Sequence, residues 1–581
     1  MNKENLDNLR HSCAHLLAAA VLKLYPNAKP TVGPPIEEGF YYDFDFETPI
    51  SENDLMKIDQ KMRELVKKWV SVEKIEVSKN EALKKYKGNK YKQELINEFS
   101  EEGKQITFYK SGDFIDLCRG GHVENPSQEI KHFKLLSIAG AYWRGSEKNK
   151  MLTRIYGTAF KSKADLDNFL TMKEEAKKRD HKKLGKELDL FTFSDLVGSG
   201  LPLYTPKGAL LRRLLTEYLE EIQSKEGYSQ VWTPQLAKAE LFKKSGHYDK
   251  FKDDMFIVKS HYSDEEMFLK PMNCPQHTQI YASKSRSYRD LPIRYTDFAM
   301  LYRDEQPGQL NGLARVRAFS QDDCHVFCRE DQVNDEIDKM LMMTKKVMST
   351  FGFKYRYRLS TRDPKHPEKY FGDLKTWDKV EKWAEKIMKR NNIDYFDGPG
   401  EATFYAPKMD LMATDALGRE WQLSTVQIDF VQPARFELKF IDKDGKEKTP
   451  IMIHRAILGS SERLMMILIE HYSGAFPLWL APVQVKIIPI AEKHNNFAQK
   501  IAKELKKNDI RTDVNEKSES MQKKIREAQL EKVYYMLVVG DREIDSGEIN
   551  VRTRDGKTSS MTLDVFIKDT KENIAKRTNL S

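Results

Sequence analysis

Residues 302–327 read YRDEQPGQLNGLARVRAFSQDDCHVF and contain two extended runs joined by a loop rich in glycine, proline and asparagine. This pattern predicts a hairpin. Arg303, Glu305, Arg315 and Arg317 stand close to the turn, so their charged groups converge at one end of it. Arginine binds phosphate oxygens through a planar fork, and glutamate can accept hydrogen bonds from an adenine amino group. The hairpin therefore suggests a nucleotide site, although the same residues could be ordinary surface charges.

The sequence around this hairpin, residues 189–482, predicts an antiparallel sheet flanked by helices. The expected long helices cover 210–224, 332–350 and 377–391, and the extended runs cover 294–301, 314–327 and 421–430. Beyond it, residues 483–581 alternate strand and helix patterns, which predicts a compact α/β domain with a mainly parallel sheet.

The N-terminal part of the chain predicts a third folded domain. Residues 1–163 combine an apolar-periodic helix at 6–24 with β-type runs at 40–46, which indicates an α+β domain. Residues 164–188 are strongly charged and predict a solvent-bridging helix between domains. The fold class is therefore a multidomain protein of α/β and α+β type.

Composition supports this division and limits the classes of function. A chain of 581 residues predicts roughly three to four domains. The net charge of +9 is a weak indication of a polyanionic partner such as RNA. Five cysteines argue against a disulfide framework and for a reducing compartment. Without a signal peptide pattern or an apolar run of about 20 residues, the sequence predicts a cytoplasmic protein with no membrane partner.

Three stretches of the sequence, one of them the hairpin, resemble the signature motifs of a single protein family. Residues 302–327 resemble the second signature motif of class II aminoacyl-tRNA synthetases, in the form found in threonyl enzymes. Residues 454–468, HRAILGSSERLMMIL, resemble the third motif with Arg463 at its matching position, and the helix leading into GYSQVWTPQL resembles the first, ending at Pro234. Further matches lie at 202–209, 268–277, 403–411 and 481–490, so the resemblance covers nearly the whole chain.

The sequence departs from this family pattern in three places. The small N-terminal ubiquitin-like domain of many relatives is not expected here. Leu423 and Ser424 stand where the family commonly has Cys-Gly, and Gly121 stands where proline is usual. These departures concern the shape of the pocket and the coupling to tRNA rather than the reaction.

The resemblance implies a homodimer that activates L-threonine with ATP, transfers it to tRNA(Thr) and hydrolyses mischarged Ser-tRNA(Thr) at a separate site. It makes Cys274, His325 and His454 the ligands of one Zn²⁺ per subunit, which their sequence spacing could not show. One thiolate and two imidazoles leave an open position for the amine and hydroxyl of threonine. Valine lacks the hydroxyl and is rejected, whereas serine lacks only one methyl group, so a second hydrolytic sieve is expected.

The same resemblance assigns the remaining catalytic residues. Arg303 contacts the α-phosphate, Arg315 and Arg463 the outer phosphates and Glu305 the adenine of ATP, which arrives with Mg²⁺. The ATP site also includes Phe319, Gln422 and Thr425. The threonine pocket includes Met272, Gln321, Asp323, Tyr405 and Gln427, and the catalytic set is Arg303, Arg463, Lys408, Gln321, Asp323 and Tyr405.

In the N-terminal domain, His11 and His15 lie one helical turn apart, and Cys118 and His122 lie in DLCRGGH. Four such side chains suggest either a zinc site or chance. The resemblance makes them an editing site, acting with Asp116 and Lys92 on the ester of Ser-tRNA through water. Editing without a metal is preferred, and zinc stays as the alternative.

Asn515, Glu543 and Arg552, in the C-terminal domain, match anticodon-contacting residues of this synthetase subgroup, where splayed bases are read through their edges. Two rival functions remain. One is a tRNA-binding or regulatory relative that has lost aminoacylation, and the other is a synthetase for serine or proline. The joint presence of Arg303 and Arg463 argues against the first, and neither rival needs the proposed zinc ligands.

Overall fold

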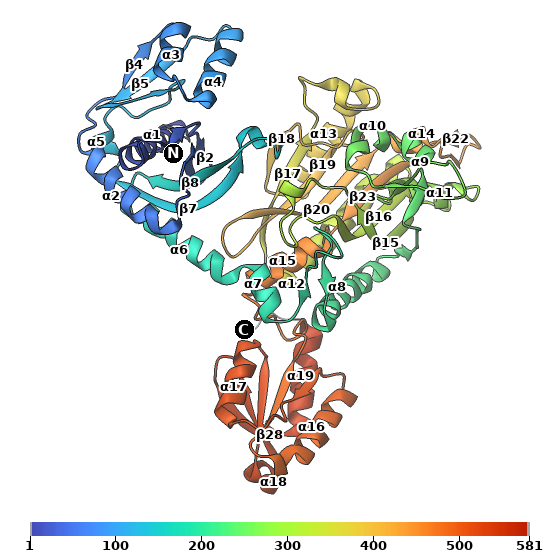
Figure 1. Ribbon diagram of the computed structural model, residues 1–581. Coiled ribbons are helices and arrows are strands. Elements are labelled where there is room, and N and C mark those ends of the chain that lie inside the picture. Colours follow the sequence, from blue (N-terminus) through green and yellow to red (C-terminus); the bar gives the residue numbers. More distant parts are fainter. Residues whose placement is uncertain (1–2, 578–581) are drawn as a thin grey trace. The chain divides into compact units, whose positions relative to one another are not determined.

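The computed structural model describes residues 3–577, which form two compact units that divide between Glu174 and Glu175. In the first unit, helix α1 (Lys3–Leu24) packs its alanine- and leucine-rich sequence against an antiparallel sheet of order β1-β3-β8-β7, with β2 on β3 (Figure 1). The strands of this sheet are β1 (Lys29–Pro30), β2 (Pro35–Ile36), β3 (Gly39–Asp45), β7 (His132–Tyr142) and β8 (Met151–Phe160). The α+β prediction is confirmed.

A smaller antiparallel sheet completes this unit, and its last strand leads into the segment that carries Cys118. Its strands are β4 (Glu73–Glu76), β5 (Thr107–Ser111) and β6 (Phe114–Leu117). The other helices of the unit are α2 (Leu55–Val66), α3 (Lys79–Lys85), α4 (Lys90–Glu101) and α5 (Pro126–Glu129).

The charged segment that contains the boundary between the two units forms two helices instead of the single helix expected over 164–188. Helix α6 (Lys163–Arg179) is mostly exposed, and α7 (His181–Glu187) follows it. Asp180 separates them because its side chain accepts hydrogen bonds from the first backbone amides of α7 and so starts a new helix. Helix α7 is not solvent-bridging, since His181, Leu184 and Gly185 are buried.

The central sheet of the second unit has eight strands in the order β11-β15-β16-β23-β20-β19-β17-β18. All neighbours are antiparallel except the two end pairs, β11–β15 and β17–β18. The strands are β11 (Ser229–Gln230), β15 (Ile293–Tyr302), β16 (Ala318–Cys328), β17 (Lys354–Thr361), β18 (Tyr395–Pro399), β19 (Lys408–Thr414), β20 (Glu420–Asp429) and β23 (Ile451–Ala456). The predicted antiparallel sheet is confirmed, with β16 beginning later than the extended run expected from residue 314.

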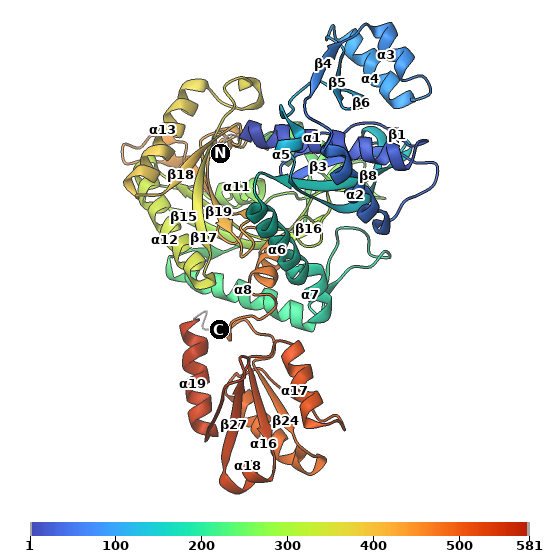
Figure 2. The ribbon, with the colours of Figure 1, turned by 90° about the vertical axis from the view of Figure 1, so that its left-hand side faces the viewer.

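Long helices cover this sheet, as predicted (Figure 2). The three predicted helices are α8 (Pro206–Lys225), α12 (Val333–Phe351) and α13 (Leu374–Arg390), and a fourth, α15 (Ser461–His471), was not predicted. The shorter elements are β9 (Phe191–Thr192), β10 (Leu203–Tyr204), β12 (Leu236–Lys238), α9 (Ala239–Ser245), α10 (His247–Phe251), β13 (Ile257–Val258), β14 (Met267–Leu269), α11 (Cys274–Ala282), α14 (Gln432–Arg435), β21 (Phe440–Ile441) and β22 (Glu447–Lys448).

The C-terminal sheet is mixed rather than mainly parallel. Its order is β25-β24-β26-β27-β28, in which the first three strands are parallel and the last two form an antiparallel hairpin. The strands are β24 (Val485–Pro489), β25 (Thr512–Val514), β26 (Tyr535–Val539), β27 (Glu548–Thr553) and β28 (Thr558–Thr562), and the helices are α16 (Asn495–Lys507), α17 (Met521–Leu530), α18 (Asp541–Ser546) and α19 (Leu563–Lys576). This part has its own hydrophobic core.

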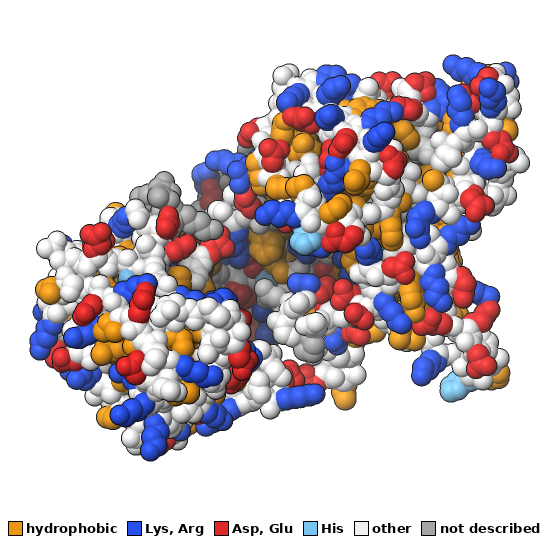
Figure 3. Space-filling model, turned by 90° about the horizontal axis from the view of Figure 1, so that it is seen from above, with side chains coloured by type: hydrophobic (Ala, Val, Ile, Leu, Met, Phe, Trp, Pro, Cys, Tyr) orange, Lys and Arg blue, Asp and Glu red, His pale blue; other side chains and the backbone are white. Residues whose placement is uncertain are grey.

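Two surface properties bear on partners. Lysine and arginine side chains are interspersed with aspartate and glutamate over the face in Figure 3, in keeping with the modest net charge. Within residues 3–577, no helix has both the length and the apolar character needed to cross a bilayer. The charge pattern of this face does not by itself mark a path for RNA.

Candidate active site and editing site

A cavity of about 620 Å³ lies against the central sheet. Strands β16, β19, β20 and β23, helix α15 and the loop of the β15–β16 hairpin contribute its walls. Every residue predicted for the catalytic site lines this cavity except His325, which is fully buried behind it. The lining residues from that prediction are Met272, Cys274, Arg303, Glu305, Arg315, Phe319, Gln321, Asp323, Tyr405, Lys408, Gln422, Thr425, Gln427, His454 and Arg463.

The three predicted metal ligands meet at one wall of this cavity. Cys274 is the first residue of α11, and His325 on β16 pairs directly with His454 on β23. The Nε2 atom of His325 lies 3.0 Å from Nδ1 of His454. The ligand atoms of all three side chains lie within 4.8 Å of one another, and all three side chains are buried. Strand register therefore brings together residues that are far apart in the sequence.

Neighbouring polar groups orient both imidazoles. The Nε2 atom of His454 lies 2.8 Å from Oδ2 of Asp429, and Nδ1 of His325 lies 2.8 Å from Nδ1 of His277. These contacts leave the other nitrogen of each ring directed toward the other ring, and burial lowers the pKa of His325 well below its usual value. Oriented imidazoles and a buried cysteine are the donor set that zinc prefers. The residues thus fit the metal.

Sequence analysis missed these orienting residues. His277 is three residues after Cys274 on α11, so helical spacing was the signal available for it. Asp429 gave no signal, because only the pairing of β20 with β23 places it near His454. A third missed residue is Asp410, which is fully buried and lies 3.1 Å from Nζ of Lys408.

Polar side chains form a small pocket beside the three ligands. The Oδ1 atom of Asp323 lies 3.7 Å from Nε2 of His325, and the ring of Tyr405 stacks on His454 at 4.9 Å between centroids. Gln427 pairs with His454 across the strands, and its buried Oε1 atom has no hydrogen-bond partner among residues 3–577. An unpaired buried acceptor is costly, so this pocket is suited to a small polar ligand.

Three arginines gather at the other end of the cavity. Arg303 lies over the ring of Phe319, with 5.1 Å between Cζ and the centroid, and Arg315 contacts Glu305 at 2.8 Å. Burial lowers the pKa of Arg463, and the positive charges of Arg303 and Arg315 lower it further. Such crowding of cations favours an anion with several oxygens, such as a polyphosphate.

Leu423 and Ser424, the two residues of β20 that depart from the family pattern, have different surroundings. Leu423 is buried and lines the cavity, whereas the hydroxyl of Ser424 donates a hydrogen bond of 2.9 Å to the carbonyl oxygen of Ala456. Leu423 therefore affects the shape of the cavity, and Ser424 reinforces the pairing of β20 with β23.

A second cluster, in the N-terminal unit, contains the four residues predicted from the His pair and the DLCRGGH segment. The Sγ atom of Cys118 lies 3.2 Å from Nε2 of His122 and 3.4 Å from Nε2 of His11. The ligand atoms of these residues and of His15 lie within 4.8 Å of one another. Burial lowers the pKa of His15 to about 3 and that of His122 to about 2, and it raises the pKa of the Cys118 thiol to about 11.

The other two predicted editing residues form a buried ion pair next to this cluster. Nζ of Lys92 lies 2.6 Å from Oδ1 of Asp116, and both side chains are almost completely buried. Tyr42 and Tyr86 donate hydrogen bonds of 2.5 and 2.8 Å to the same carboxylate. Burial opposes ionisation of Asp116, but Lys92 and the other partners of this carboxylate lower the pKa of Asp116 to about 2. Lys92 is therefore paired and fixed in position.

The segment between Cys118 and His122 has an unusual backbone. Gly121 adopts a φ of +82°, and its carbonyl oxygen lies 3.1 Å from Nδ1 of His11. Proline is restricted to a φ near −65°, so the residue usual in the family could not adopt this conformation. The departure at Gly121 thus coincides with a backbone conformation that glycine permits.

The predicted anticodon residues occupy separate positions in the C-terminal sheet region. Asn515 follows β25, Glu543 lies in the first turn of α18, and Arg552 lies on β27. No hydrogen bond or ion pair joins any two of them in the described chain. The Nε atom of Arg552 is buried and has no hydrogen-bond partner among residues 3–577.

Three family descriptions match separate parts of the chain. Residues 256–472 match the core domain of class II tRNA synthetases for G, H, P, S and T. Residues 484–576 match an anticodon-binding domain, and residues 106–156 match the second additional domain of threonyl and alanyl tRNA synthetases.

Individual relatives match over much greater lengths. The threonine–tRNA ligase of Rubrobacter xylanophilus is 48% identical over 99% of this chain and 90% of its own length. That of Geobacillus kaustophilus is 48% identical over 97% of this chain and 87% of its own. A solved RNA-binding domain of threonyl-tRNA synthetase from Cryptosporidium parvum is 36% identical, covers 68% of this chain and 98% of that chain, and has a TM-score of 0.65. With matches of this identity along nearly its whole length, the chain belongs to the threonine–tRNA ligase family of class II synthetases.

Proposed function

We propose that this protein activates L-threonine with ATP, transfers it to tRNA(Thr) and hydrolyses Ser-tRNA(Thr) at its N-terminal cluster. The main observation in support of the proposal is that one cavity has three arginines at one end and the cluster of Cys274, His325 and His454 at the other. One end suits a triphosphate and the other a small polar amino acid, so the two reactants would meet between them.

Threonine selection follows from the pocket beside the three ligands. Zn²⁺ bound by them would supply an open coordination position for the amine and hydroxyl of the amino acid. Asp323 and the unpaired Oε1 of Gln427 would accept hydrogen bonds from the amine or hydroxyl. A buried acceptor left unpaired by valine would reject that competitor strongly.

Adenylate formation would depend on positioning and charge. Arg303 would bind the α-phosphate, Arg315 and Arg463 the outer phosphates, and Glu305 and Phe319 the adenine. Positively charged groups fixed before the reaction stabilise the developing charge without reorganisation. ATP would bring Mg²⁺, which shares this neutralisation.

Gln422, Thr425 and Gln427 would form the floor of the same site. The amino acid and its reacting carboxylate would be surrounded by Gln321, Asp323, Tyr405 and Lys408, with Met272 in the threonine pocket. Nζ of Lys408 and Nε2 of Gln422 both contact the buried Asp410, at 3.1 and 3.0 Å. This shared carboxylate would hold the two side chains in place.

Editing would take place at the cluster of His11, His15, Cys118 and His122, where neutral imidazoles can bind and orient a water molecule. The buried Lys92–Asp116 pair would hold the adjacent strand β6 in place. The geometry also allows these four side chains to bind a metal. We favour hydrolysis without a metal, because serine requires a second sieve that a structural zinc would not provide.

The proposal extends to partners and to the limits of the domains. Trp232, in the stretch that resembles the first motif, is 75% exposed, which supports a homodimer interface there. All five cysteines are free, which fits a reducing, cytoplasmic location. Asn515, Glu543 and Arg552 would contact the anticodon. We assign residues 1–163 to editing, 164–188 to the linker, 189–482 to catalysis and 483–581 to anticodon binding.

The experiment that tests this function is ATP–pyrophosphate exchange with threonine, serine, valine and proline. We expect rapid exchange with threonine, weaker exchange with serine and almost none with valine or proline. Exchange with none of the four would favour a tRNA-binding relative without aminoacylation. Preferred exchange with serine or proline would indicate a different synthetase.

A further inference from the structure

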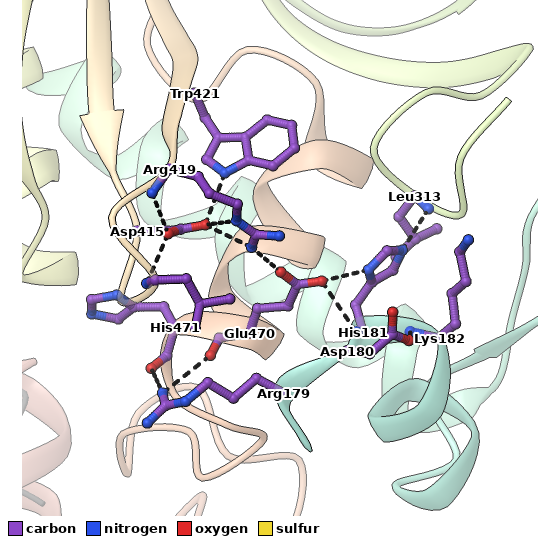
Figure 4. Close-up of polar contacts among 11 residues, drawn as sticks. Arg179, Asp180, His181, Lys182, Leu313, Asp415, Arg419, Trp421, Glu470 and His471 are labelled. Carbon is purple, nitrogen blue, oxygen red and sulfur yellow. Dashed lines mark hydrogen bonds and ion pairs between the residues drawn. The ribbon is translucent and has the colours of Figure 1, made fainter. Parts of the chain in front are cut away.

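One side chain outside the cavity is hydrogen-bonded to the loop of the β15–β16 hairpin. His181 is the first residue of α7, and its Nε2 atom lies 3.1 Å from the backbone nitrogen of Leu313 in that loop. Its Nδ1 atom lies 2.7 Å from Oε1 of Glu470 on α15. Figure 4 shows the imidazole between the loop and the helix. His181 is only 3% exposed, and Leu313 is fully buried.

The two contacts determine which nitrogen of His181 carries the proton. A backbone N–H can only donate, so Nε2 must accept from Leu313 and the proton must reside on Nδ1. Nδ1 then donates to Glu470, whose other oxygen pairs with Arg419. Arg419 is in turn held by Asp415, with 2.7 Å between Nε and Oδ2 (Figure 4). Both nitrogens of the imidazole are therefore used for specific contacts.

Helix α15 contacts the same loop a second time. Glu470 lies seven residues after Arg463 on this helix, which places both side chains on one face. The Nε atom of Arg463 donates to the carbonyl oxygen of Ala314 at 3.3 Å. Two consecutive loop residues are thus fixed to α15, Ala314 directly and Leu313 through His181. The residue that follows them is Arg315.

Gly312 makes this approach possible. It has a φ of +49°, and a Cβ atom added there would lie 2.1 Å from Nε2 of His181. Any larger residue would force the imidazole away from Leu313. The loop and the histidine are therefore matched in shape as well as in hydrogen bonding.

Asp180, His181 and Glu470 also lie close enough together to resemble a metal site. Asp180, however, accepts hydrogen bonds of 2.9 and 3.0 Å from the backbone amides of Lys182 and Lys183 at the start of α7. His181 has no free nitrogen left for an ion. The arrangement is better suited to holding the loop than to binding a cation.

We infer that His181 is a positioning residue for ATP: by joining Leu313 to Glu470 it holds Arg315 and Arg463 at the spacing that one polyphosphate chain requires. It touches no substrate and acts through the loop and α15. The inference rests on the proposed function, in which Arg315 and Arg463 bind the outer phosphates.

A pair of substitutions separates the two contacts. In His181→Asn the amide nitrogen reaches about as far as Nδ1, so the donor to Glu470 is kept and the acceptor for Leu313 is lost. In His181→Gln the amide oxygen reaches about as far as Nε2, so the acceptor for Leu313 is kept. We expect His181→Asn to raise the KM for ATP in pyrophosphate exchange by on the order of 10- to 100-fold. The KM for threonine should stay near the wild-type value, and His181→Gln should recover most of the loss.

Tyr218→Phe is the matched control, because Tyr218 donates a partly buried hydrogen bond of 2.7 Å to Thr350, and neither residue belongs to the loop or to α15. It should lower the unfolding temperature as His181→Asn does and leave the KM for ATP unchanged. Gly312→Ala should reproduce the ATP defect of His181→Asn.

The inference is overturned if the KM for ATP is normal in His181→Asn, or if the loss follows the unfolding temperature and also appears in Tyr218→Phe. Calorimetric titration of the same proteins with ATP alone measures the change in affinity for ATP without any exchange reaction. Failure of the wild-type chain to exchange with threonine would instead contradict the proposed function, so the two failures are distinguishable.

Discussion

Cys274 differs from the other four cysteines because it lines the cavity and lies beside the imidazoles of His325 and His454. We predict that Cys274→Ala loses the bound zinc, expected at one ion per subunit, and abolishes threonine activation. Three ligands are the minimum that holds the ion and leaves a position open, so one substitution is enough. Metal content and pyrophosphate exchange measure the two effects.

Cys328→Ala is the control for this substitution. Cys328 is a fully buried thiol at the end of β16 that lies outside the metal cluster. Its loss should cost about 1 kcal/mol of stability and leave zinc and exchange intact. Full activity of Cys274→Ala, or of metal-stripped wild-type protein, would contradict the assignment.

Cys118 provides the corresponding test in the N-terminal unit. We predict that Cys118→Ala, like His11→Ala, leaves threonine activation nearly unchanged while Ser-tRNA(Thr) accumulates, because no earlier step removes serine. A deacylation assay on preformed Ser-tRNA(Thr) measures this directly.

Metal counting on the same Cys118 variant decides between editing and structural zinc. A structural site would give about two zinc ions per wild-type chain, and its loss would unfold the domain, since such sites contribute folding energy. A well-folded Cys118→Ala protein that still clears Ser-tRNA(Thr) at the normal rate would refute the editing role.

Individual residues also show which parts of the site could be predicted from the sequence alone. Cys274, His325 and His454 were identified through family resemblance, because gaps of 51 and 129 residues contain no local ligand pattern. Asp429, the partner of His454, could not be predicted, since strand pairing rather than sequence distance places it there. Gly121 was noticed as a departure, but only the backbone shows its positive φ.

At the scale of elements, the hairpin loop and α15 together supply the arginines of the phosphate end. We predict that Arg463→Ala and Arg303→Ala each slow adenylate formation by at least about 100-fold, because each removes a preorganised charge. Hydrolysis of preformed Ser-tRNA(Thr) should be nearly normal, since the cluster with Cys118 belongs to the other unit. Equal losses in both reactions would refute the separation of the two sites.

The periodicity of apolar residues predicted some helices and strands well and missed others. Helices α8, α12 and α13 were expected within a few residues of their observed limits, because each has a regular apolar face. The break between α6 and α7 was missed, since the charged composition concealed the capping role of Asp180. The hairpin of β27 and β28 was also missed, although Asp555 and Gly556 mark its turn.

For the molecule as a whole, the exposed Trp232 leads to a prediction about assembly. We expect the wild-type protein to sediment as a dimer and Trp232→Asp to shift it toward the monomer, because a charge would replace an aromatic anchor of the interface. Analytical ultracentrifugation over a range of concentrations measures the change. The control is Tyr262→Asp, because the side chain of Tyr262 is 98% exposed. Trp421 would not serve as a control, because it packs against the core. An unchanged dimer in Trp232→Asp would place the interface elsewhere.

The direct pairing of His325 with His454 has a consequence for how the central sheet is assembled. Successive side chains of a strand point to opposite faces, so a slip of one residue between β16 and β23 would turn one imidazole away from the other. An ion that requires both rings binds only the correct pairing. Metal binding would thus act as a check on strand alignment, and chains with a misaligned sheet would be recognised by their inability to retain zinc.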